Sequence, residues 1–411
     1  MGFESLSPTR MRGFWVTWSP DSPGSDAVKT QSEPGNPEAE KYLEILTDNY
    51  KRLPWGNPPY PIKVKAIWFD NERGELCWIN TLKLPHVEET VCSSSPERVA
   101  KAIVDMEIRG APAIGVAAAL AIGSYALKSS STGIDDFTQG VRRAISILSK
   151  TRPTAYNLFY ALRRMENTLG NALKKTSDPV KVAEILVKEA LSIYWEDVWA
   201  NLRIGEYGAE LVPDNATILT HCNAGALATS AYGTALAVVR VAWYKGKKVR
   251  VIATETRPML QGARLTVYEL MKEGIPVTLI TDNSVGMVLR RGLVDLVIVG
   301  ADRITRDGYV VNKIGTYMNA LAARRHNKPF YVAAPTSTID MSRTIDQVVI
   351  EERDPSEVKY IYGNPIAPRE VNALNYAFDV TDPDLVTAII TERGVVYPPY
   401  GENLEKLFKP L

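Results

Sequence analysis

Cysteine and histidine are scarce in this sequence, which narrows the chemistry open to it. The 411 residues include three cysteines, Cys77, Cys92 and Cys222, and three histidines. Three widely spaced cysteines predict neither a disulfide framework nor a thiolate metal cluster. No two histidines have the spacing of metal ligands, which disfavours a zinc enzyme. We therefore expect no metal site and a cytoplasmic location.

Excess charge and long apolar runs are also missing. The net charge is +1, so there is no electrostatic case for nucleic acid or a membrane surface as the main partner. No apolar run reaches the roughly 18 residues that a membrane span requires. The apolar run at residues 14–18 is too short for a signal peptide. These absences favour a small molecule as the partner of an ordinary globular protein.

The length predicts two domains, because a single core rarely organises so long a chain. Residues 1–61 read as a partly disordered extension, since residues 19–37 are rich in serine, proline and glycine. Residues 62–212 predict an N-terminal domain, in which a β-hairpin is followed by helices. Residues 213–411 predict a Rossmann-like domain.

In this last region short apolar runs alternate with helical stretches. The expected strands are residues 217–220, 250–253, 276–281, 296–299 and 330–333. The expected helices lie near residues 228–244, 262–273, 284–291 and 315–326. This alternation predicts an α/β fold with a doubly wound parallel sheet. Ligands of such sheets bind at the carboxyl ends of the strands, so the residues after each strand are the candidates.

Two reactive side chains follow expected strands. Cys222 lies between the first strand and an expected helix, whose N-terminus would favour the thiolate. A free cysteine is also commonly buried and inert, and the local sequence leaves both interpretations open. Asp302 follows the fourth strand, where a desolvated carboxyl group serves as an acid or base, or caps a turn. No GxGxxG or P-loop pattern follows any strand, so nothing indicates a nucleotide.

Two arginines precede expected helix starts. Arg109 is followed by Gly110 and Ala111, and Arg152 stands directly before a proline. An arginine beside a helix N-terminus suits a phosphate group, although a plain turn between helices is equally consistent.

Further polar candidates follow the strands. Gln261 comes after the second strand, and Asn312 and Lys313 come after the fourth. A lysine beside an asparagine can hold a phosphate or a sugar hydroxyl, or simply be a solvated loop residue. Polar groups gathered at one sheet edge suit a small, anionic, hydroxyl-rich ligand.

Several long motifs occur in a recognisable order. They are RGAPAIG, RPTAYNL, THCNAGALAT, ETRP, QGARLT, DNSVGM, VGADRI, NKIGTY and PFYVAAPTSTID. Over residues 62–400 the chain resembles the methylthioribose-1-phosphate isomerases, which share a superfamily with the α, β and δ subunits of the translation factor eIF2B. The resemblance implies a cofactor-free aldose–ketose isomerase of methionine salvage, typically a homodimer, that converts 5-methylthioribose 1-phosphate to 5-methylthioribulose 1-phosphate.

The resemblance also implies roles for individual residues. Cys222 and Asp302 would be catalytic. The substrate-binding residues would be Arg109, Gly110, Ala111, Arg152, Gln261, Asn312 and Lys313. The chain departs from the family at residues 375–379, Asn-Tyr-Ala-Phe-Asp, where the second residue is usually proline.

Two other functions stay in view. A ribose-1,5-bisphosphate isomerase would need a second phosphate site, and the block at residues 378–392 looks more like the methylthioribose enzymes. A non-catalytic subunit like those of eIF2B is disfavoured because both Cys222 and Asp302 are present. The sequence does not decide whether hydrogen moves between the sugar carbons as a proton, through an enolate, or as a hydride.

Overall fold

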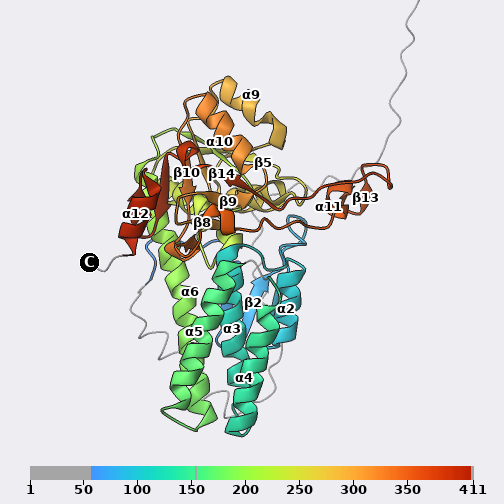
Figure 1. Cartoon of the computed structure of the whole chain (residues 1–411), viewed down its shortest axis with the longest axis vertical. Coiled ribbons are helices and arrows are strands. Elements are labelled where there is room, and N and C mark those ends of the chain that lie inside the picture. The colour runs from blue at the N-terminus through green and yellow to red at the C-terminus, as the bar shows by residue number, and fades with distance from the viewer. Residues whose placement is uncertain (1–56, 153–154, 409–411) are drawn as a thin grey trace, which may run out of the picture.

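The computed structural model describes residues 57–152 and 155–408 (Figure 1), so residues 1–56 of the predicted extension lie outside it. The described chain begins with a three-stranded antiparallel sheet. Its strands are β1 (Ile67–Asp70), β2 (Glu75–Ile79) and β3 (Thr90–Ser93). The hairpin predicted around residues 70–75 is confirmed as the β1–β2 pair. The third strand was not predicted.

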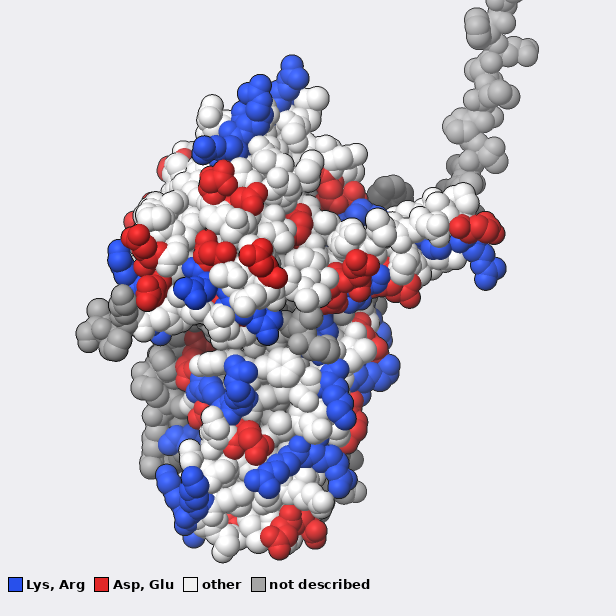
Figure 2. Space-filling view, in the orientation of Figure 1, with Lys and Arg blue, Asp and Glu red and all other residues white. Residues whose placement is uncertain are grey.

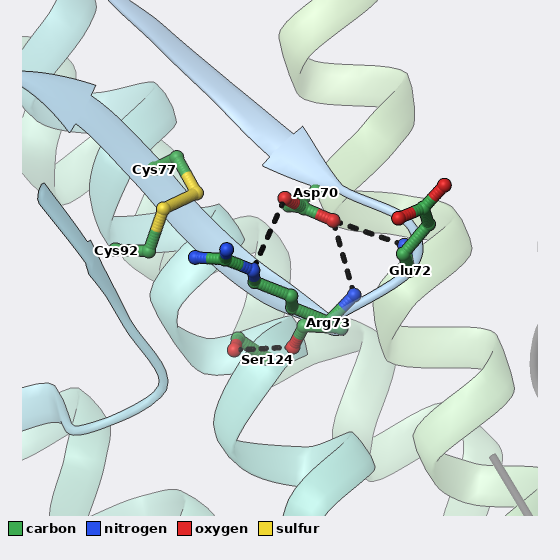
Figure 3. The surroundings of a disulfide bond; sticks show 7 residues. Asp70, Glu72, Arg73, Cys77, Cys92 and Ser124 are labelled. Atoms are coloured by element: carbon green, nitrogen blue, oxygen red, sulfur yellow. Dashed lines mark hydrogen bonds and ion pairs between the residues drawn. A yellow bond between two sulfur atoms is a disulfide. The ribbon is translucent and has the colours of Figure 1, made fainter. Parts of the chain in front are cut away.

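A disulfide bond corrects the expectation that the three cysteines stay apart. Cys77 on β2 lies directly opposite Cys92 on β3, and their sulfur atoms are 1.99 Å apart. Figure 3 shows the bond close to the β1–β2 turn, where the Asp70 carboxylate accepts two backbone N–H groups. The pairing depends on the register of β3 against β2, and without that strand the sequence offers no reason to join the two residues.

Five helices complete the N-terminal part. They are α2 (Pro96–Val104), α3 (Ala111–Ser129), α4 (Ile134–Ser149), α5 (Tyr156–Leu173) and α6 (Pro179–Glu210). Helix α3 lies at the centre and packs against α4, α5 and α6 (Figure 1). A Cβ atom at Gly115 would lie 2.6 Å from the backbone oxygen of Asn157, so the missing side chain lets α5 approach closely.

Helix α3 also corrects the expectation about long apolar runs. It has 19 residues and is apolar enough to cross a membrane by length and composition, the one such helix in the described chain. However, 83% of its apolar window is buried inside the protein. Its alanine and glycine residues interrupt the bulkier apolar ones, which is why the run is inconspicuous in the sequence. The burial is that of a core helix.

The C-terminal part is built on a seven-stranded sheet with the order β16-β15-β10-β7-β4-β5-β6. The strands are β4 (Thr217–Thr220), β5 (Arg250–Thr254), β6 (Val277–Ile280), β7 (Leu296–Val299), β10 (Phe330–Ala333), β15 (Ala388–Thr391) and β16 (Gly394–Val396). Every neighbouring pair is parallel except β15–β16. The predicted α/β fold with a parallel sheet is therefore confirmed. Chain order runs outward in both directions from β4 and β7, which makes their carboxyl ends the switch point.

Helices and turns connect these strands. The helices are α7 (Ala235–Tyr244), α8 (Val267–Glu273), α9 (Val285–Arg290), α10 (Thr316–Arg325), α11 (Ser356–Lys359) and α12 (Tyr400–Leu407). The short turns are η1 (Ala226–Ala228), η2 (Gly262–Thr266), η3 (Asp282–Ser284), η4 (Thr336–Thr338), η5 (Ile345–Gln347) and η6 (Pro383–Leu385). Helix α7 begins later than the predicted residue 228.

Two smaller sheets were not predicted. The first has the order β11-β8-β9-β14 and consists of β8 (Arg303–Thr305), β9 (Val310–Lys313), β11 (Ile339–Asp340) and β14 (Phe378–Thr381). The second pairs β12 (Tyr360–Ile361) with β13 (Asn364–Pro365). With α11 the second sheet forms an arm that projects sideways (Figure 1). Figure 2 shows positive and negative side chains interspersed over the visible face, apart from a basic cluster at the end where α9 and α10 lie.

Candidate active site

The predicted site residues come together at the carboxyl edge of the large sheet, where they line two adjoining pockets. Five residues line both pockets: Cys222, Asp302, Arg109, Gly110 and Ala111. The first pocket is also lined by Arg152, Gln261 and Lys313, and the second pocket is also lined by Asn312. Cys222 follows β4 and Asp302 follows β7, its neighbour in the sheet, so the two side chains meet at the switch point.

Both the backbone N–H and the backbone carbonyl of Cys222 are hydrogen-bonded, which holds the turn in place. Cys222 has a φ of 61°, a left-handed conformation that is uncommon outside glycine. Its N–H donates to Thr256 Oγ1 over 2.9 Å, and its carbonyl oxygen accepts from Thr266 Oγ1 over 2.6 Å. No α-helix begins here, because the chain passes through η1 before α7 starts. The prediction that Cys222 lies at a helix N-terminus is therefore wrong.

The charge state of the thiol differs from the expectation as well. Burial raises the pKa of Cys222, and the positive charges of Arg109 and Lys313 only partly oppose that rise. The predicted acidic thiol depended on a helix N-terminus, and without that helix desolvation dominates. Burial therefore favours the neutral thiol of Cys222 over the thiolate in this pocket.

Asp302 has the desolvated environment that its place after a strand predicts. Burial raises its pKa, while Lys313, Arg109 and Arg152 lower it in part, and the net change is upward. Its backbone N–H donates to the Val311 carbonyl over 3.0 Å, which ties the residue to β9. Burial therefore favours the protonated form of Asp302 more than in an exposed aspartate, which suits a group that gives a proton within the pocket.

Lys313 is not a solvated loop residue but part of β9. Its Nζ donates to the Ala377 carbonyl over 2.8 Å and lies 4.7 Å from the centre of the Phe378 ring. Burial lowers its pKa, against the opposing effects of Cys222 and Asp302. The neighbouring Asn312 is buried, and its Nδ2 donates to Thr316 Oγ1 over 2.9 Å.

The N-terminus of α3 opens into both pockets beside Arg109. The Arg109 guanidinium donates from Nη1 to the Asn223 carbonyl over 2.9 Å and to Asn223 Oδ1 over 2.7 Å. Gly110 is the N-cap with a φ of 94°, and no described side chain caps the helix. A Cβ at Gly110 would lie 2.5 Å from the Ala228 oxygen, so only glycine fits. The free N–H groups and the helix dipole favour a phosphate at this point.

The remaining two candidates supply polar contacts on the other walls. Arg152 Nη2 lies 3.5 Å from Glu351 Oε2, and both residues line the first pocket. The proline after Arg152 falls outside the described residues. Gln261 is buried, and its Oε1 has no hydrogen-bond partner within the described chain. A buried acceptor without a partner suits a ligand hydroxyl group.

Sequence reasoning missed the apolar wall of the first pocket. Its larger apolar side chains are Met106, Ile114, Val311, Val348, Val349 and Phe378. Glu351 and Arg303 also line this pocket and were assigned no role. Most of these residues come from the four-stranded sheet β11-β8-β9-β14 or from the segment that follows η5. Neither was predicted from the sequence. Among residues 57–152 and 155–408, no group of His, Cys, Asp or Glu side chains is arranged to hold a metal ion.

A family model, a protein of known function and two solved structures all match most of this chain. The model of the "Initiation factor 2 subunit family" matches residues 107–398. The chain is 53% identical over 352 residues to the methylthioribose-1-phosphate isomerase of Thermosipho africanus, covering 85% of this chain and all of that protein.

Two solved structures are similar to most of this chain. One is 5-methylthioribose 1-phosphate isomerase from Pyrococcus horikoshii OT3, with a TM-score of 0.79, 45% identity, and coverage of 85% of this chain and 98% of that one. The other is translation initiation factor eIF-2B, subunit delta, from A. fulgidus, with a TM-score of 0.76, 47% identity, and coverage of 84% and 99%.

Proposed function

The chain belongs to the initiation factor 2 subunit family and, within it, to the methylthioribose-1-phosphate isomerases, and we propose that the pocket at its switch point is the active site of that isomerisation. The enzyme is a sugar-phosphate isomerase of methionine salvage, and its substrate is 5-methylthioribose 1-phosphate. The observation that supports the proposed site is the meeting of Cys222 and Asp302 beside the uncapped N-terminus of α3.

The phosphate ester on the anomeric oxygen of the sugar explains why both Cys222 and Asp302 are needed. Phosphate esterifies the anomeric oxygen, so the ring opens only when the ring oxygen takes a proton as its bond to C1 breaks. Asp302, a carboxyl group whose pKa burial raises, is our candidate acid for that step. C1 then gains the hydrogen that C2 loses, and the proton on the C2 oxygen leaves as the carbonyl forms. Cys222 is our candidate partner at these carbons.

The apolar wall supports methylthioribose over a sugar with a second phosphate. If the C1 phosphate binds at Arg109 and the α3 N-terminus, we place the far end of the sugar against Met106, Val349 and Phe378, which line the same pocket. A methylthio group is apolar and polarisable, and it gains from burial against such side chains. A second phosphate dianion placed against these three side chains would lose water and gain no hydrogen bond from them. We therefore propose that this wall selects the methylthio group.

A turnover assay with both sugar phosphates tests the proposal. In the presence of a chelator, we expect conversion of 5-methylthioribose 1-phosphate with a kcat/KM far above that for ribose 1,5-bisphosphate. Faster turnover of the bisphosphate would instead support a ribose-1,5-bisphosphate isomerase. No turnover of either sugar, combined with stable binding to a translation factor, would support a regulatory subunit, the role suggested by the name of the A. fulgidus protein.

The two arginines give a prediction about binding. Arg109→Ala and Arg152→Ala are each expected to raise KM about tenfold or more while kcat changes less, because both contact the ground-state substrate. Steady-state kinetics measure the two constants separately. Arg143→Ala, an exposed arginine on α4, is the control and should leave both constants unchanged. An unchanged KM in either pocket variant would move the phosphate site elsewhere.

We also propose that the enzyme is a homodimer. Two large apolar side chains of the C-terminal part, Met287 on α9 and Met318 on α10, are 58% and 66% exposed. These two helices pack against each other. An exposed apolar area of this kind commonly marks a subunit interface. Light scattering should give twice the chain mass, and Met287→Glu with Met318→Glu should give one chain mass.

A cytoplasmic location is part of the same proposal. A phosphorylated sugar carries charge that keeps it from crossing membranes unaided, so the enzyme should share the compartment in which its substrate is made. Cell fractionation with activity measurement tests this, and activity confined to a membrane or exported fraction would contradict it.

A further inference from the structure

A buried cluster of charged residues lies behind the candidate active site. Arg240 on α7 donates from Nη2 to Glu269 Oε2 over 2.6 Å and from Nε to Glu273 Oε1 over 2.5 Å. The three side chains are 1%, 0% and 2% exposed. Burial alone would lower the pKa of Arg240, but the two glutamates raise it overall. The arginine therefore stays charged between the two glutamate side chains.

Only one of the two glutamates also contacts the turn that carries Cys222. Glu269 Oε1 accepts from Asn223 Nδ2 over 2.5 Å, and its Oε2 accepts from the Ala226 backbone N–H over 2.7 Å. Glu273 Oε2 instead accepts from the Tyr244 hydroxyl over 2.8 Å. The two carboxylates thus share the same arginine and nearly the same burial, but they differ in their contact with the site.

Asn223 connects Glu269 to Arg109. Its amide nitrogen donates to the Glu269 carboxylate, so its amide oxygen must point the other way, toward Arg109 Nη1, 2.7 Å distant. A carboxylate accepts but does not donate, and it therefore fixes which way the amide is oriented. The negative charge of Glu269 also polarises the amide and strengthens the bond to Arg109.

Glu269 packs directly against the turn as well. A Cβ atom at Gly225 would lie 2.1 Å from Glu269 Oε1, so the turn touches the carboxylate where no side chain intervenes. Asn223 and Ala226, which both donate to Glu269, lie on the two sides of this glycine. The carboxylate therefore holds the turn on both sides.

We propose that Glu269 is a positioning residue of the isomerase: through Asn223 it holds the Arg109 guanidinium ready for the substrate phosphate, and it fixes the turn that carries Cys222. This inference rests on the proposed function.

Glu269→Gln and Glu273→Gln form a matched pair for the test. In Glu269→Gln one carboxylate oxygen becomes an NH2 group. That group faces either the Asn223 amide nitrogen or the donors of Arg240 and Ala226, and both arrangements set two donors against each other. The hydrogen bond with Asn223 is therefore lost, or Asn223 turns its amide around. We expect a KM for 5-methylthioribose 1-phosphate raised about tenfold, with a smaller decrease in kcat. Glu273→Gln should lower the melting temperature to a similar extent but leave both constants within about twofold of wild type. Equal kinetic effects in the two variants would overturn the proposal.

A double-mutant cycle shows whether Glu269 acts through Arg109. If it does, Glu269→Gln should change KM by less than about twofold when Arg109 is already alanine, because the positioned group is gone. If the KM of the double variant is instead raised by the product of the two single-variant increases, Glu269 acts independently of Arg109, and the proposal is overturned.

A polarity swap keeps the inference testable even if Glu269→Gln fails to fold. In Asn223→Asp with Glu269→Gln, the new amide donates to the new carboxylate, which still accepts from Arg109, and the net charge is unchanged. We expect this variant to recover most of the wild-type KM, and a folded variant with a raised KM would contradict the inference. Absence of turnover in the wild-type enzyme would count against the proposed function instead.

Discussion

Replacement of Cys222 by serine is expected to lower kcat at least about a hundredfold, the usual scale for loss of a group that transfers protons. Serine has nearly the same shape and keeps the backbone bond to Thr256. Its hydroxyl, however, is a far weaker acid than a thiol. Burial raises the pKa of Cys222, but it would disfavour the charged form of a serine hydroxyl in the same way, so the thiol stays the stronger acid of the two. KM should change little, since the phosphate contacts are untouched.

Single-turnover and steady-state rates with 5-methylthioribose 1-phosphate measure this effect. Cys77→Ser combined with Cys92→Ser provides the control, because these residues form the disulfide in the N-terminal sheet and do not line either pocket. That variant should keep kcat within about twofold of wild type at a temperature where it is folded. Near-normal turnover in Cys222→Ser would assign the buried sulfur to packing alone.

Asp302→Asn is expected to lower kcat by at least about a hundredfold as well. The amide matches the neutral carboxylic acid in shape but cannot give a proton to the ring oxygen. The pH dependence has a definite sign. An acid must be protonated to act, so the wild-type rate should fall as pH rises through the pKa of Asp302, which burial raises above the ordinary value for aspartate. The slow residual activity of Asp302→Asn should lack that decline.

Profiles of kcat against pH for the two proteins measure the difference. Asp197→Asn is the matched control, because burial also raises the pKa of Asp197, to about 6, although Asp197 does not line either candidate pocket. Its profile should keep the alkaline decline of the wild-type enzyme. If Asp302→Asn retains that decline at a near-normal rate, another group supplies the proton.

The sequence predicts the large sheet well and its surroundings less well. The runs at residues 217–220, 296–299 and 330–333 match β4, β7 and β10, because a strand buried on both faces must be continuously apolar. The rule that ligands bind at strand ends then identifies Cys222 and Asp302 without any contact being known. Strand ends are therefore the part of this site that pattern alone can identify.

The elements that were missed depend on contacts distant in sequence. The small sheet that carries Asn312, Lys313 and Phe378 has strands of two to four residues, too short for an apolar pattern to be visible. The Ala-rich segment after Cys222 has a helical composition, yet Gly225 pairs with Gly233 and Glu269 binds the turn, so the helix starts only at α7. Tertiary contacts outweigh local propensity here.

The central position of α3 has a consequence for how the enzyme is made. During synthesis this helix leaves the ribosome long before α5 and α6, the partners that cover it. Until residue 210 has emerged, a nascent chain presents an apolar helix of membrane-like composition to water, which is the kind of segment that chaperones bind. The start of α3, where the candidate phosphate-binding residues lie, is thus made before the helices that cover α3 and before the strands whose ends complete the candidate pocket.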